Sequence, residues 1–518
     1  MIRFATSLER VSDMANLTPA LEAERQKILK IAKDSGLDIF ETIFELISYD
    51  QINQFAAFGG FPVRYPHWKF GMEYEHLSKS YEYGLSKIYE MVINTDPCYA
   101  YLMEGNSMMD QKLVMAHVYG HCDFFKNNVW FAKTNRKMMD AMANHATRIR
   151  RYMDRHGYDV VETFIDRCLS LENLIDRYSV YYEPSRSREE APQQKQKEYL
   201  LRYDREYMRD YINPPSFVAE QKQRMHDIAA KRSKFPEEPE RDILRFLMAY
   251  APLADWQQDV LSIIRDEAYY FAPQGMTKTM NEGWASYWHT KLMTQKILND
   301  SEIIDYADHH SGTVAMSPQS YNPYKVGIEL FRDIEDRWNK GQFGRDWENC
   351  DDVRERKNWD RRTNLGRDKI FEVRKIYNDV TFIDEFLTEE FCLKNRFFVY
   401  KFNKRTNQFE VDTRDFKAIK AKLLFQMTNF GQPIIRIDDA NFENRGELLL
   451  SHLWEGIDMQ PDFMTETMKN LFGVWTRPVN LLTVLDNERM LCRFDGKEWT
   501  QHKLSGPEPA PATTEEKK

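Results

Sequence analysis

Apolar residues recur at helical spacing through the first two-thirds of the chain, and this period constrains the fold more than any other feature. Between Phe70 and Val92 they fall three or four positions apart, which is typical of one face of an amphipathic helix. Comparable periods predict further helices at 110–127, 160–178, 241–250, 255–271 and 279–297. Thr18 and Pro19 form a helix start, with a threonine cap and proline at the first helical position. We therefore expect a mainly α protein with a large helical domain over residues 1–385.

The pattern changes near residue 386, where short apolar stretches alternate with turn-like segments. Strands are predicted at 397–402, 409–411, 423–428, 434–437, 479–485 and 489–494, and a helix is predicted at 462–472. The first two strands should pair as a hairpin, and so should the next two, around Gly431 and Pro433. We expect a small α+β C-terminal module over residues 386–504.

Three polar segments are expected to lie outside the packed core. Residues 183–197 and 339–368 are polar and rich in charge, so we expect surface connections there. The tail, residues 505–518, has the proline-rich, charged composition of a disordered segment.

Composition and charge exclude several classes of protein. The formal net charge is -9, and acidic and basic residues are interspersed, which gives no electrostatic footprint for nucleic acid. The six cysteines contain no C-x-x-C pair, so we expect thiols in a reducing compartment rather than disulfide bonds. No stretch approaches the run of about 18 apolar residues that a membrane span needs, and the N-terminus lacks a signal-peptide core. These features predict a cytoplasmic protein that neither binds nucleic acid nor spans a membrane.

Two histidines at ligand spacing form the first candidate site. His117 and His121 lie four residues apart, so on a helix both side chains project from one side and can grip one metal ion. Leu113, Gly120 and Phe124 share that face, so both imidazoles should point into the core. The alternative is a pair of ordinary core histidines, since H-x-x-x-H is a common pattern.

A second segment, 279–289, carries an acidic residue that would complete the site. Glu282 would be the third ligand of a His₂Glu set with an open fourth position. The alternative is structural, because Thr279 and Glu282 fit a capping box at a helix N-terminus. The stretch 281–287, N-E-G-W-A-S-Y, resembles the N-E-G-F-A-S-Y segment of gluzincin aminopeptidases, in which the glutamate is a zinc ligand on a separate helix. This resemblance implies a zincin-like site on two helices, with zinc preferred and iron or manganese as alternatives.

The general base of such a site is missing from its usual place. In H-E-x-x-H the second residue activates the metal-bound water, and here Val118 occupies that position. Glu267 is the first candidate for the role, since it falls on an apolar stripe that would desolvate it; a buried salt bridge is the alternative. Glu73 is a second candidate on an earlier helix. His289 lies two turns beyond Glu282, too far to share one ion easily, so we expect it to support a ligand or contact substrate.

Several longer segments identify the chain, by resemblance, as a member of the SpoVR (stage V sporulation protein R) family. They are residues 68–75, 87–106, 117–125 and 271–285, and the resemblance covers nearly the whole chain. It implies a link to late sporulation and the spore cortex, and relatives also occur in bacteria that form no spores. It also implies two partners, a PrkA-like serine protein kinase and a von Willebrand-type protein, which are often encoded beside such proteins.

Two functional hypotheses follow from these residues. The first is a metal-dependent hydrolase that acts on an amide or peptide, with zinc on His117, His121 and Glu282 and a separate carboxylate as base. The alternative is a non-catalytic regulatory or scaffold protein that works in sporulation or stress physiology with a PrkA-like kinase assembly. Val118 in the base position favours this alternative.

Overall fold

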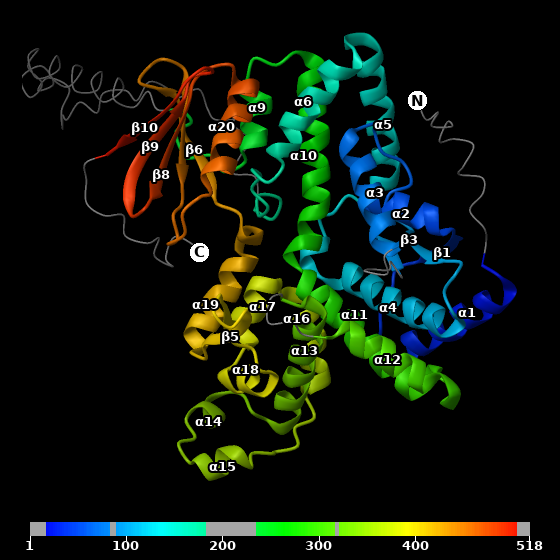
Figure 1. Cartoon of the computed structure of the whole chain (residues 1–518). Coiled ribbons are helices and arrows are strands. Elements are labelled where there is room, and N and C mark those ends of the chain that lie inside the picture. Colours follow the sequence, from blue (N-terminus) through cyan, green and yellow to red (C-terminus); the bar gives the residue numbers. More distant parts are fainter. Residues whose placement is uncertain (1–16, 83–89, 183–234, 316–320, 505–518) are drawn as a thin grey trace, which may run out of the picture. The chain divides into compact units, whose positions relative to one another are not determined.

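The computed structural model describes residues 17–82, 90–182, 235–315 and 321–504, and Figure 1 labels its elements. The chain divides into two compact units, each built from two stretches. The first unit comprises Met1–Glu162 and Tyr269–Gly431, and the second comprises Thr163–Ala268 and Gln432–Lys518. The predicted connection at 183–197 and the predicted tail at 505–518 lie outside the described residues.

The first unit is mainly helical, as the apolar period predicts. Its first stretch contains α1 (Pro19–Asp34), α2 (Tyr49–Ala57), α3 (Trp68–Glu82), α4 (Met108–Asn127) and α5 (Met138–His156). Its second stretch contains α11 (Lys278–Leu292), α12 (Ile303–Thr313), α13 (Pro323–Lys340), α14 (Arg345–Glu348), α15 (Val353–Lys357), α16 (Gly366–Ile376), α17 (Asp379–Phe386), α18 (Glu389–Asn395), α19 (Phe416–Met427) and the strands β4 (Val399–Asn403) and β5 (Gln408–Thr413). Two helices, α6 (Tyr158–Ser170) and α10 (Asp255–Met276), contribute residues to both units. Thr18 caps α1, as predicted, by accepting a hydrogen bond from Leu21 N at 3.3 Å.

A small three-stranded sheet lies in the same unit. Its central strand is β3 (Cys98–Met103), with β1 (Thr42–Ile47) parallel on one side and β2 (Glu90–Ile93) antiparallel on the other. The helix predicted from Phe70 through Val92 is therefore right for α3 and wrong at its end, where Val92 pairs with Ala100. Pairing with β3 overrides the helical period, and a β-branched residue such as Val92 suits a strand.

Helix α4 forms the centre of the core of the first unit, and its central turns are buried on all sides. It packs against α11 through Gly120, where a Cβ atom would lie 2.7 Å from the Cα atom of Ala285. In turn, α11 packs on α13 through Gly283, where a Cβ atom would lie 2.4 Å from the Cα atom of Gly327. The three helices therefore meet backbone against backbone, which these glycines permit because they carry no side chain.

The second unit is built around a five-stranded sheet with strand order β10-β9-β8-β7-β6. Its strands are β6 (Ile435–Phe442), β7 (Glu447–His452), β8 (Val479–Leu485), β9 (Glu488–Phe494) and β10 (Trp499–Lys503), and its helices include α9 (Ile243–Tyr250) and α20 (Pro461–Trp475). Strands β7 and β8 run parallel, and α20, which joins them, packs on β8 and β9 (Figure 1). The predicted C-terminal sheet region is confirmed, including the helix at 462–472 and the strands at 479–485 and 489–494.

One predicted hairpin is right and the other is wrong. Strands β4 and β5 pair antiparallel where a hairpin is predicted. Residues 423–428, predicted as a strand, instead lie at the end of α19, and the strand at 434–437 pairs with β7. Asp415 caps α19 by accepting a hydrogen bond from Ala418 N at 2.8 Å. This cap, together with the alanine and lysine residues that follow it, favours the helix over the hairpin.

Gly283→Ala is expected to lower the free energy of unfolding by about 1–3 kcal/mol, because the added methyl group overlaps the backbone of α13. Chemical denaturation followed by circular dichroism measures the change. Gly312→Ala on α12 is the matched control, since no described atom lies within 4 Å of a Cβ atom built there. Equal stabilities of the two variants would contradict the close packing of α11 on α13.

Candidate metal centre

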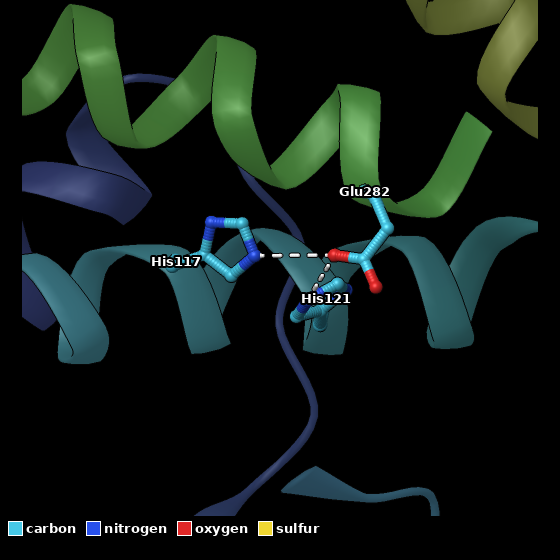
Figure 2. Close-up of side chains that lie close together, drawn as sticks. All are labelled: His117, His121 and Glu282. Carbon is cyan, nitrogen blue, oxygen red and sulfur yellow. Dashed lines mark ion pairs between the residues drawn. The ribbon is translucent and has the colours of Figure 1, made fainter. Parts of the chain in front are cut away.

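Helices α4 and α11 bring three candidate metal ligands together (Figure 2). His117 and His121 project from α4, and their Nε2 atoms each lie 3.4 Å from Oε2 of Glu282 on α11. All three residues are buried, with 3%, 5% and 7% of their surface exposed. Among the described residues they form one cluster, with donor atoms within 4.8 Å of one another. The three residues that the sequence predicts as ligands are therefore neighbours in the fold.

The two nitrogen–oxygen separations of 3.4 Å match the spacing of ligands around a tetrahedral ion. Bonds of about 2.0–2.1 Å from zinc to nitrogen and oxygen place two ligands of a tetrahedral ion about 3.3 Å apart. A direct hydrogen bond between a charged imidazole and a carboxylate would be shorter, about 2.7–2.9 Å. In addition, Glu282 Oε2 is buried and makes no hydrogen bond to any described residue. Such an oxygen is costly to bury unless a cation lies close to it.

Hydrogen bonds on the far side of the rings orient both imidazoles. Oδ1 of Asn281 accepts a hydrogen bond from Nδ1 of His121 at 2.8 Å. On His117, Nδ1 lies 2.7 Å from Nδ1 of His289. When Nδ1 carries the proton, Nε2 presents its lone pair toward the Glu282 carboxylate, and this is the form of histidine that binds a metal.

His289 lies behind His117 as a neutral hydrogen-bond acceptor. Burial, followed by the nearby His117, lowers the pKa of His289 well below its usual value. Its Nδ1 atom then accepts a hydrogen bond from His117, while its Nε2 atom lies 3.5 Å from Nδ1 of the half-buried His310 on α12. The structure thus places His289 against a predicted ligand rather than in the cluster itself.

Glu282 is ionised despite its burial. Burial raises the pKa of Glu282, but the charge of a protonated His121, the Nε2–H groups of His117 and His121 next to the carboxylate, and the charge of Lys278 together outweigh burial and hold the pKa well below its usual range. The Lys278 ammonium donates a hydrogen bond to Oε1 at 2.8 Å, which leaves Oε2 to face the histidines. The carboxylate can therefore offer one oxygen to a metal while a lysine neutralises the other.

The capping-box alternative for Glu282 is not observed. Asp379 of α17 satisfies the start of α11, since its carboxylate accepts hydrogen bonds from Thr279 N at 2.7 Å and from Met280 N at 2.9 Å. Burial raises the pKa of Asp379 to about 7, and the two backbone donors offset only part of the rise. No local pattern links positions 279 and 379, so the sequence could not predict this cap.

A buried ion pair next to the cluster anchors α4. Asp123, two residues beyond His121, accepts hydrogen bonds from Trp284 Nε1 at 2.8 Å and from the Arg374 guanidinium. Burial raises the pKa of Asp123, and the charge of Arg374 offsets part of the rise. The network therefore ties α4, α11 and α16 together beside the candidate ligands.

The candidate general bases lie outside this cluster. Glu267 is buried on α10 and belongs to the second unit, whereas Glu73 is exposed on α3. Val118 is fully buried and offers no proton acceptor. The catalytic roles of Glu267 and Glu73 stay predictions.

Sequence reasoning misses two partners of the cluster. Asn281 hydrogen-bonds His121. Its position directly before Glu282 could have identified it as a residue that supports a ligand. His309 and His310 form a pair in a polar stretch, where histidines are usually solvated. The pair lies on α12, and His310 stacks on Tyr306 with its ring 5.5 Å from that of His289.

The fold and the cluster define a mainly helical protein with a buried His₂Glu cluster on two packed helices. A family model described as SpoVR like protein matches residues 16–432, and the chain belongs to the SpoVR family. This match confirms the membership that the sequence resemblance predicts. It ends at the residue where the second stretch of the second unit begins.

A relative from Escherichia coli (strain K12), the "Uncharacterized protein YcgB", is similar over most of its length. It is 28% identical over 503 residues, which cover 90% of this chain and 92% of the relative. No solved structure matches the chain. In the part of the chain that the structure describes, no helix combines the length and the apolar character of a membrane span.

Arg374→Met is expected to destabilise the protein by about 3–5 kcal/mol, because it leaves the buried Asp123 charge without its partner. Thermal or chemical unfolding measures the loss. Arg361→Met is the control, since its ion pair with Asp346 is exposed and should contribute at most about 1 kcal/mol. Similar small losses in both variants would show that the Asp123 pair does not anchor α4.

His289→Ala is expected to weaken zinc binding by about 10- to 100-fold, because His117 loses the acceptor that orients its ring. Competition with a chromophoric chelator measures the affinity. His76→Ala on α3 is the control, since this histidine is exposed and should leave the affinity unchanged. An affinity of the His289 variant equal to that of the control would rule out a positioning role.

Proposed function

We propose that this protein is a metal-dependent, zincin-like hydrolase that cleaves an amide or peptide bond. The observation that best supports this function is the set of three donors on His117, His121 and Glu282. Among the described residues, no fourth histidine, cysteine or carboxylate joins that cluster. Three protein ligands with an open position for water are typical of catalytic zinc, whereas structural zinc has four protein ligands.

The residues around the cluster fit this role. Asn281 and His289 hold the two imidazoles with Nε2 toward Glu282, and Lys278 neutralises the second carboxylate oxygen. Zinc held there would supply a Lewis acid for a carbonyl group and would lower the pKa of bound water. Iron or manganese suits the same donors, and zinc is the metal we prefer.

The proton acceptor has to come from outside the H-x-x-x-H motif, because Val118 occupies the place of the usual glutamate. Glu267 and Glu73 are the carboxylates proposed for this role from the sequence. Glutamine at either position would remove the base and keep the size of the side chain. Such a variant of the true base is expected to retain its metal and lose hydrolysis.

The family resemblance supports the substrate class. A link to sporulation and the spore cortex favours a cell-wall-derived peptide or amide, and a cytoplasmic location would favour a precursor or a protein over mature cell wall. If the source bacterium forms no spores, we propose a role in stress physiology in place of sporulation.

A second candidate function is a non-catalytic regulatory or scaffold role with a PrkA-like serine protein kinase assembly and a von Willebrand-type protein. The observation that favours it is the fully buried valine at the position of the general base. In that case the same three donors would hold a metal only to stabilise the helices.

Elemental analysis of untagged protein tests the metal centre directly. The wild-type chain is expected to carry about one equivalent of metal, since the three donors form one cluster. The double variant His117→Ala/His121→Ala should lose the metal and stay folded by circular dichroism. The double variant His76→Ala/His156→Ala is the matched control, because both histidines are exposed.

Hydrolysis is then measured with the metal-loaded protein on quenched fluorescent peptides and on soluble cell-wall peptides. Turnover that the ligand variant loses and the control variant keeps would support the hydrolase. Absence of metal from the wild-type protein, even after zinc is supplied, would rule it out. Bound metal without turnover of either substrate set would favour the regulatory role.

A further inference from the structure

A cavity of about 660 Å³ lies in the first unit, on the side of α4 that faces away from the metal cluster. It is lined by residues of α1, by the segment 39–44 and by Tyr119 of α4. Tyr119 is two positions from both His117 and His121, so its side chain projects from the opposite side of the helix. A volume of this size falls in the range of small-molecule sites, about 300–1,000 Å³.

Tyr119 is the most deeply buried polar residue that lines this cavity. The residue is only 1% exposed, and among the described residues its hydroxyl proton has no acceptor, since the neighbouring Arg25 can only donate. A tyrosine phenol carries its proton at neutral pH and can donate it to an acceptor in the cavity. A buried hydroxyl whose proton has no acceptor costs free energy that an acceptor in the cavity would recover.

Arg25 adds a second set of donors to the cavity. Its Nε and Nη2 atoms donate to the Glu22 carboxylate at 2.7 and 2.6 Å, and Nη1 carries further N–H groups. The guanidinium lies next to the Tyr119 phenol, and both residues line the cavity. Glu22 therefore takes two of the Arg25 donors, and a ligand in the cavity would use the remaining N–H groups.

The walls of the cavity are partly apolar and partly polar. Leu29, Ile39 and Phe44 line them, and the Phe44 ring meets the Tyr119 ring edge-on at 5.4 Å. Lys33 and Glu41 also line the cavity, and both are exposed. Because their charges are opposite, together they favour neither an anionic nor a cationic ligand. The cavity therefore offers hydrogen-bond donors from Tyr119 and Arg25 beside apolar side chains.

We propose that this cavity binds a small organic acid with an apolar body, whose carboxylate accepts hydrogen bonds from Tyr119 and Arg25. The apolar part of the ligand packs on Leu29, Ile39 and Phe44. This site is separate from the metal cluster, and its occupancy does not require a bound metal.

Isothermal titration calorimetry of the full-length chain with decanoate, kept below its micelle concentration, tests the proposal. One saturable site is expected. Decylammonium has the same chain and the opposite charge, and it should bind at least about tenfold more weakly because its head group only donates. Saturable binding of both probes with equal affinity would overturn the carboxylate assignment.

Two variants locate the binding within the cavity. Tyr119→Phe removes only the hydroxyl and should weaken decanoate binding about five- to tenfold. Leu29→Trp should weaken binding by narrowing the apolar part of the cavity. Tyr182→Phe is the control, since Tyr182 is 66% exposed and does not line the cavity. Unchanged decanoate affinity in the folded Tyr119 variant, or no saturable binding to the wild-type chain, would overturn the proposal.

Discussion

The cluster of candidate ligands depends on the close approach of α4 and α11, and α13 packs equally closely on α11. Gly120 lets α4 contact the backbone of α11 at Ala285, and Gly283 lets α11 contact α13 at Gly327. Packed helices usually lie about 8–10 Å apart, and the close glycine contacts bring α4 and α11 together at the cluster. The Nε2 and Oε2 atoms of the candidate ligands can then meet at 3.4 Å on short side chains.

The polar groups buried around the cluster both orient the candidate ligands and contribute to the stability of the core. Asn281 and His289 accept hydrogen bonds from the imidazoles, and Arg374 compensates Asp123. Removing one member of such a network leaves a donor or a charge unsatisfied, which costs more than the contact itself contributes. Glu282 Oε2 has no hydrogen-bond partner among the described residues, and a cation between the three donors would satisfy it.

Errors in the predicted fold come from contacts that local patterns do not encode. The apolar period that predicts α3 continues into β2, where pairing with β3 decides the conformation. Residues 423–428 form a short, largely apolar run of the kind that predicts a strand. The Asp415 cap and packing against the rest of the unit instead favour the helix α19. By contrast, α4, α10 and α20 lie close to their predicted positions, because their periods are long and uninterrupted.

By itself, the sequence predicted most helices, most C-terminal strands, the family and three candidate ligands that prove to be neighbours, because each depends on spacing within a short segment. Only the tertiary structure showed that His289 contacts His117, that Asp379 caps α11 and that Tyr119 lines a cavity. The first two contacts join residues 172 and 100 positions apart. The spacing of residues within a short segment does not show which residues far apart in the sequence come into contact, because the packing of the helices decides that.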